Sequence, residues 1–148
     1  MNRRTAREIT LGLIFDYSFN MDTAPEELFN LYISYYPDEE TGVIAHDIKR
    51  DKYITPTYNG VVEKLSEIDA IIEKASQNWN MDRISRVSMS ILRLAVYEIV
   101  FVDDIPPKVS ANEAVELAKK FDDDKGYSFI NGILGYVIRN NPNSNKQL

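Results

Sequence analysis

Apolar side chains recur at three- and four-residue spacing along most of this 148-residue chain. This spacing places them on one face of a helix, so it predicts a series of amphipathic helices. We expect these helices at about 5–19, 25–36, 56–65, 66–79, 84–101, 110–121 and 127–139. No two alternating segments joined by a hairpin turn occur in the sequence, so the predicted fold class is all-α.

The segment 84–101 is the most apolar of these, which is typical of a helix at the centre of a bundle. Pro106 and Pro107 follow it and prevent its continuation. Ser110 and Glu113 then have the spacing of a capping box, which predicts the start of the next helix.

Two polar segments interrupt the helical pattern. Residues 37–52 are poorly periodic and predicted to be mostly loop, and DDDKG at 122–126 is predicted to be a turn. The length fits one domain or two tightly packed subdomains. We place these subdomains at about 1–79 and 80–140, followed by a polar tail at 141–148.

Composition indicates an ordinary globular protein, with 44% hydrophobic and 27% charged residues. The absence of cysteine excludes disulfides and thiolate metal sites, and it fits a reducing compartment. No apolar run approaches the roughly 20 residues of a membrane span. Glu8 and Asp16 interrupt the apolar start, which therefore predicts a helix and not a signal peptide. We expect a cytoplasmic protein that does not bind membranes.

Charge is distributed unevenly along the chain. Arg3, Arg4 and Arg7 are accompanied by no acid within residues 1–7, whereas residues 21–107 carry 16 acidic and 8 basic side chains. The net charge of −6 argues against nucleic acid only if the charge is evenly spread. Polyanion binding depends on the local field, so a basic edge on an acidic body can still hold phosphates.

Residues suited to catalysis are few. His46, the only histidine, lies in a polar segment without a serine or cysteine nucleophile pattern, so we interpret it as a solvated loop residue. The acidic pair Glu39–Glu40 and the run Asp122–Asp124 lack the glycine and spacing of a calcium loop. The glycines are scattered and form no phosphate-binding loop. We expect no enzymatic activity, no metal and no cofactor.

Four motifs together resemble the NusB family of transcription antitermination factors: RRTARE near the start, then LRLAVYE, PPKVSANEAVELAKKF and SFINGIL. The resemblance is good over 3–17 and 84–139 and weak over 20–80, where only the helical pattern compares. It implies an all-α fold of two packed three-helix bundles, with one extra N-terminal or linking helix possible.

The resemblance also implies partners. Similar family members bind boxA-type RNA, a short single-stranded element of ribosomal RNA leader transcripts, together with the ribosomal protein NusE. The complex joins elongating RNA polymerase, through other Nus factors, and helps it to resist termination. We expect this chain to do the same, as a monomer or a homodimer.

Several residues match family positions associated with RNA. Arg3 and Arg4 are expected to contact phosphates, and Arg7, one turn after Arg3, either joins them or pairs with a neighbouring acid. Phe15, in place of an expected tyrosine, and Phe129 are expected to stack on bases, although core packing is the alternative for both.

The remaining assignments concern the second half of the chain. Lys125 lies just before the last predicted helix, whose N-terminus could attract an anion. Ser88 is a candidate contact to NusE, whereas Lys119 and Lys120 are expected on a solvated helix face. The acids Asp122–Asp124 should weaken RNA binding alone and increase dependence on the protein partner.

Two other interpretations stay open. The same helical module resembles the N-terminal part of certain ribosomal RNA methyltransferases, although this chain has no strand-rich nucleotide-binding region for methyl transfer. A helical protein-interaction bundle that self-associates is the second, because nine tyrosines leave room for an aromatic interface.

Overall fold

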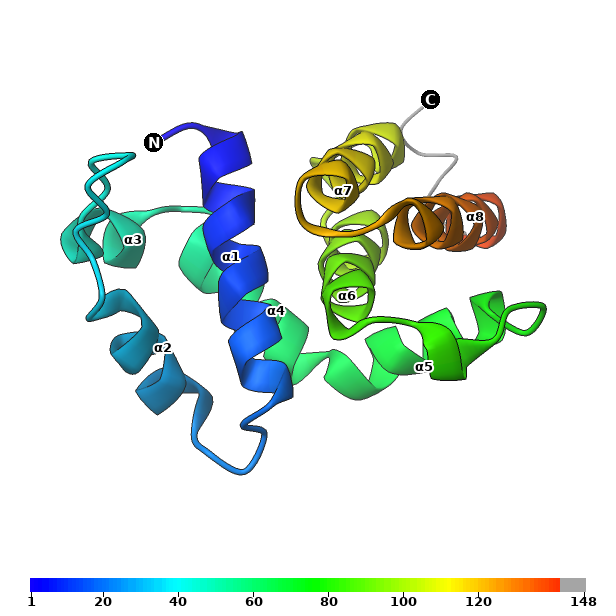
Figure 1. Cartoon of the computed structure of the whole chain (residues 1–148), viewed down its shortest axis with the longest axis horizontal. Helices are drawn as coiled ribbons and strands as arrows, with labels where there is room; N and C mark the ends of the chain where they lie inside the picture. Colours follow the sequence, from blue (N-terminus) through cyan, green and yellow to red (C-terminus); the bar gives the residue numbers. More distant parts are fainter. Residues whose placement is uncertain (142–148) are drawn as a thin grey trace. The chain divides into compact units, whose positions relative to one another are not determined.

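The computed structural model describes residues 1–141, and every regular element in this range is helical (Figure 1). The chain divides into two compact units, Met1–Glu63 and a second that begins at Lys64. The first contains α1 (Arg3–Ser18), α2 (Pro25–Ile33), α3 (Ala45–Arg50) and α4 (Ile54–Glu63). The second contains α5 (Leu65–Ala75), the short 3-10 helix η1 (Met81–Arg83), α6 (Arg86–Phe101), α7 (Pro107–Phe121) and α8 (Asp124–Asn140).

The predicted all-α fold class is confirmed. Each unit has four α-helices among the described residues, which is one more than three per bundle. The division also falls earlier than the expected boundary at 79/80, because α5 packs against α6 and α8 and so belongs to the second unit. Within residues 1–141, no helix is long and apolar enough to cross a membrane. The predicted polar tail lies mostly outside the described residues.

In the first unit, α1 packs against α2 and α4. Ala6, Ile9 and Leu13 are buried at the three- and four-residue spacing that predicted this helix. Burying such side chains contributes about 1.5–3 kcal/mol for each large aliphatic group. Asn2 caps the helix by accepting a hydrogen bond from the Thr5 amide at 2.8 Å, so α1 begins at Arg3 and includes all three N-terminal arginines.

Residues 37–52 are mostly outside helices, as expected, but this expectation missed α3 at Ala45–Arg50. The Ile44 amide donates to Asp47 Oδ2 at 3.3 Å and starts the helix, and Ile48 is fully buried against the unit. Because α3 buries only this one large side chain, it leaves no periodic pattern in the sequence. Asp51 then accepts hydrogen bonds from the Tyr53 and Ile54 amides at 2.8 and 2.9 Å, so α4 starts before Pro56.

In the second unit, α6 is the central helix, as its apolar sequence predicts, and packs against α5, α7 and α8. Arg93 makes a bidentate ion pair with Asp69 of α5, at 2.9 and 3.0 Å. The predicted capping box at Ser110 is wrong, because α7 already begins at Pro107. The Ser110 hydroxyl instead donates to the buried Glu98 carboxylate at 2.8 Å and joins α7 to α6.

Tyr58 of α4 provides a test of packing in the first unit. Its side chain is fully buried, and its hydroxyl donates to the Pro25 carbonyl of α2 at 3.0 Å. Burial raises the pKa of Tyr58 to about 12, above the ordinary value of 10.0. The folded state therefore keeps the Tyr58 proton at pH values where the unfolded state has already released it. The contribution of Tyr58 to the free energy of unfolding is complete below about pH 10 and is lost as pH rises toward 12.

We expect Tyr58→Phe to lower the free energy of unfolding by about 1 kcal/mol at neutral pH, where the bond to Pro25 is lost. Between pH 10 and 12 the variant should lose stability less steeply than the wild type, because it has no proton to release at this position. Urea unfolding at several pH values measures both effects. Equal pH slopes for the two proteins would contradict this account.

Candidate nucleic-acid interface

The N-terminal edge of the first unit presents Arg3 and Arg4, which are both exposed. Arg3 is not an unordered tail residue, because its guanidinium carbon lies 4.8 Å from the centre of the Tyr53 ring. Such a cation–π contact is worth about 0.5–1 kcal/mol at an exposed site. The edge is therefore partly ordered before any ligand arrives.

Arg7 differs from its neighbours because only 4% of its surface is exposed. Its guanidinium carbon lies 5.4 Å from the same Tyr53 ring. A desolvated cation–π contact is worth about 2 kcal/mol, so burial favours a structural role in which Arg7 holds Tyr53 in place. Contact between Arg7 and RNA stays a prediction.

Phe15 is half-buried near the other end of α1. Twelve residues separate it from Arg3, which is roughly 18 Å along a helix. Its ring meets that of Phe19 edge-to-face, with centroids 5.0 Å apart, and Phe19 is 55% exposed. In this unit the family resemblance assigned the stacking role to Phe15, but Phe19 is the more exposed of the two rings.

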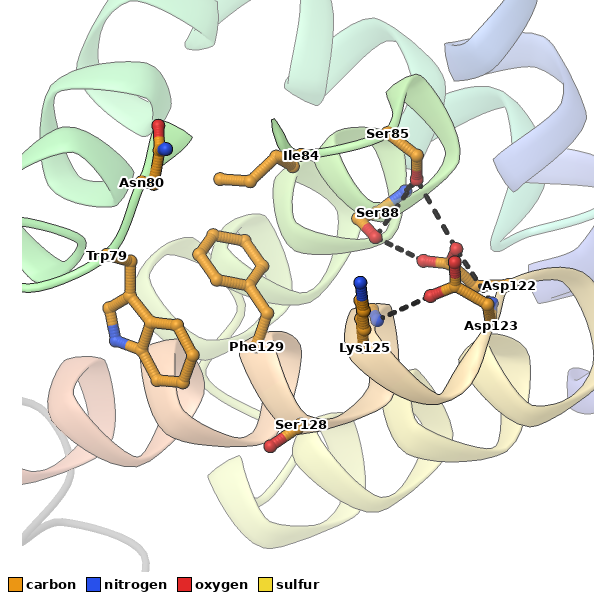
Figure 2. A pocket seen from close by; sticks show the side chains of 11 residues that line it. Trp79, Asn80, Ile84, Ser85, Ser88, Asp122, Asp123, Lys125, Ser128 and Phe129 are labelled. Carbon is orange, nitrogen blue, oxygen red and sulfur yellow. Dashed lines mark hydrogen bonds between the residues drawn. The ribbon is translucent and has the colours of Figure 1, made fainter. Parts of the chain in front are cut away.

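A pocket of about 370 Å³ opens in the second unit (Figure 2). Trp79, Ile84 and Phe129 form its apolar end, where the two aromatic rings meet edge-to-face with centroids 5.3 Å apart. Trp79 is 41% exposed, whereas Phe129 is 6% exposed. Phe129 therefore supports the pocket wall from within, and the indole of Trp79 offers the accessible flat surface.

The opposite end of the pocket is polar. Ser88 is buried and donates its hydroxyl proton to the Asp122 carboxylate, which also accepts from Ser85 at 3.4 Å (Figure 2). These bonds join the start of α6 to the end of α7. Because the Ser88 hydroxyl is already engaged, its proposed contact to NusE stays a prediction.

Lys125 is exposed in the first turn of α8 and lines the pocket. The predicted turn at 122–126 is shorter than expected, because α8 starts at Asp124. Asp123 caps the helix by accepting from the Gly126 amide at 2.8 Å. The helix N-terminus is thus occupied by its own carboxylate, and the ammonium group of Lys125 is the feature left to attract an anion.

Lys119 and Lys120 are exposed, and each lies near an exposed ring. The Lys119 ammonium is 5.7 Å from the centre of Tyr127, and the Lys120 ammonium is 5.4 Å from that of Phe121. Lys119 also pairs with Glu116 at 3.5 Å. Sequence spacing could not reveal these pairs, because a lysine on a solvated face and one beside an aromatic ring have the same pattern.

The comparisons with known proteins agree on one family. A model of the NusB family matches residues 4–139. The transcription antitermination protein NusB of Natranaerobius thermophilus is 45% identical over 137 residues, covering 93% of this chain and 94% of that protein. The protein of the same name from Clostridium botulinum is 40% identical over 141 residues, covering 93% and 100%.

Solved structures give the same result. The NusB of T. maritima has a TM-score of 0.78 and 29% identity, covering 100% of this chain and 99% of that one. A chain from a crystal structure of the antitermination factors NusB and NusE in complex with double-stranded RNA has a TM-score of 0.71 and 26% identity. The match to that chain covers 91% of the present chain and 94% of the other.

Gly132 tests the position of Trp79. A Cβ at this glycine would lie 2.7 Å from Cζ2 of the indole, so Gly132→Ala must displace the ring. Because Trp79 is the single tryptophan, we expect its fluorescence emission to shift and its quenching by acrylamide to increase. Gly135→Ala is the matched control, because its Cβ would approach only the flexible end of Arg139, at 3.1 Å. Identical spectra for both variants would show that the indole does not lie against α8.

Proposed function

Because this chain belongs to the NusB family, we propose that it is an RNA-binding transcription antitermination factor that acts on boxA-type RNA together with NusE. In this role it joins the elongating RNA polymerase complex in the cytoplasm. The observation that carries the proposal is the pocket of the second unit, which is lined by an exposed indole and a lysine.

This pocket has the chemistry that a single-stranded RNA base requires. The exposed face of Trp79 offers stacking, which is worth about 1–3 kcal/mol per base. Asn80 and Ser128 supply amide and hydroxyl groups that can bond to base edges, and Lys125 supplies charge for a phosphate. The apolar end thus gives affinity for any of the four bases, and the polar groups can add a preference for particular bases.

The first unit supplies a different contribution. Arg3 and Arg4 are exposed and carry the charge that phosphate contacts need. These contacts give affinity without sequence preference, and this affinity decreases at higher salt because the release of counterions from the phosphates becomes less favourable.

A protein partner fits the charge of the chain. The net charge is −6, and Asp123 and Asp124 are exposed beside the pocket, so repulsion weakens binding to RNA alone. A NusB chain similar to this one was crystallised with NusE and RNA, and we propose the same partner here. The role involves no chemical step and no cofactor, because it needs only binding and assembly.

The direct test is binding of a labelled boxA-type RNA and a scrambled RNA of the same composition, each with and without NusE. We expect preference for the boxA-type RNA and tighter binding when NusE is added. Fluorescence anisotropy of the RNA measures both quantities. Equal and weak binding of the two RNAs, unchanged by NusE, would refute the proposed function.

The two exposed arginines can be tested separately with Arg3→Ala/Arg4→Ala. Each lost phosphate contact reduces the slope of log affinity against log salt by about 0.7 for a single strand, so the slope should become shallower by up to about 1.4. Lys74→Ala/Lys108→Ala removes the same charge from exposed positions of the second unit and serves as control. If the arginine variant kept the wild-type salt slope, these arginines would have no part in RNA binding.

A further inference from the structure

Three further cations of the first unit shortly precede Tyr53 in the sequence. Lys49 and Arg50 occupy the last turn of α3, and Lys52 lies in the connection to α4. All three are exposed. The sequence pattern placed them in a polar loop with no assigned role, and neither the pocket nor the N-terminal arginines include them.

The contacts of Tyr53 bring these cations to the N-terminal edge of α1. Its ring lies 4.8 Å from the guanidinium carbon of Arg3 and 5.4 Å from that of Arg7. Lys52 directly precedes Tyr53, so their Cα atoms are about 3.8 Å apart. The segment that carries Lys52 therefore lies near Arg3, although the two are far apart in the sequence.

Arg50 is also restrained. Its Nη1 lies 3.4 Å from Nε2 of His46, one turn earlier on α3. This contact directs the guanidinium along the exposed side of the helix. Lys49 and Arg50 are adjacent, so both charges stay within one helical turn of the connection that leads to Tyr53.

The carboxylates of this segment, Asp47 and Asp51, each cap a helix. Asp47 accepts from the Ile44 amide at 3.3 Å, and Asp51 accepts from the first amides of α4. Both carboxylates are thus directed at helix N-termini, where the helix dipole favours negative charge. The cations outnumber them and remain on the exposed side.

We infer that Lys49, Arg50 and Lys52 join Arg3 and Arg4 in one phosphate-binding surface, organised around Tyr53, which we call the Tyr53 surface. The ligand is the backbone of the RNA strand, because several exposed cations on a partly preordered edge match successive phosphates. Tyr53 is itself buried and acts by positioning Arg3, not by stacking on a base. The inference rests on the proposed function and extends it by an element outside the family motifs seen in the sequence.

The test is the salt dependence of boxA-type RNA binding to the full chain with Lys49→Gln/Lys52→Gln. We expect the slope of log affinity against log salt to become shallower by about 1.4, because two phosphate contacts are lost. Lys74→Gln/Lys108→Gln makes the same chemical change at exposed lysines of the second unit and should leave the slope unchanged. Lys49→Arg/Lys52→Arg keeps the charge and should retain the wild-type slope.

The outcomes separate the two claims. If the wild type binds RNA and Lys49→Gln/Lys52→Gln keeps the full slope, the Tyr53 surface is refuted and the proposed function stands. If both glutamine variants lower the slope equally, the effect is one of net charge, which also refutes the surface. If the wild type binds no RNA, with or without NusE, both claims fail. Thermal unfolding of each variant shows whether a loss of RNA binding is caused by misfolding. If Lys49→Gln/Lys52→Gln is misfolded, the salt slope of Lys49→Arg/Lys52→Arg decides the result.

Discussion

The contact of two guanidinium groups with the Tyr53 ring is the interaction on which the basic edge of the first unit depends. Arg7 is buried where it makes this contact, whereas Arg3 contacts the same ring and is exposed. The start of α1 is thereby joined to the connection between α3 and α4. An acidic chain can bind a polyanion only where its cations are concentrated, and this contact concentrates them.

The second unit exposes a flat aromatic ring while its core stays buried. Phe129 is buried in α8 and its ring contacts that of Trp79, which stays 41% exposed. At the other end of the pocket, the Asp122 carboxylate accepts hydrogen bonds from Ser88 and Ser85. This negatively charged group therefore joins the end of α7 to the start of α6. In the proposed function, the first unit thus supplies exposed arginines for phosphates, and the second supplies an exposed indole for a base together with Lys125.

The sequence predicted the long helices well, because α1, α6 and α8 each bury a periodic stripe of large apolar residues. It missed α3, which buries Ile48 as its one large side chain. It also did not single out Trp79 or Tyr53. Each meets its partner, Phe129 and Arg3 respectively, fifty positions away in the sequence, and contacts at that distance leave no local pattern. The family motifs led to Phe129 and Arg3, but only the structure identified the residues that hold them.

The most direct test of the account is a map of backbone amide chemical shifts in the full chain, titrated with boxA-type RNA in the presence of unlabelled NusE and compared with NusE alone. We expect RNA-dependent changes at 3–7 and 49–53 in the first unit, and at 79–85 and 122–129 in the second. RNA-dependent changes confined to the acidic segment 63–73, with none at these four places, would contradict it.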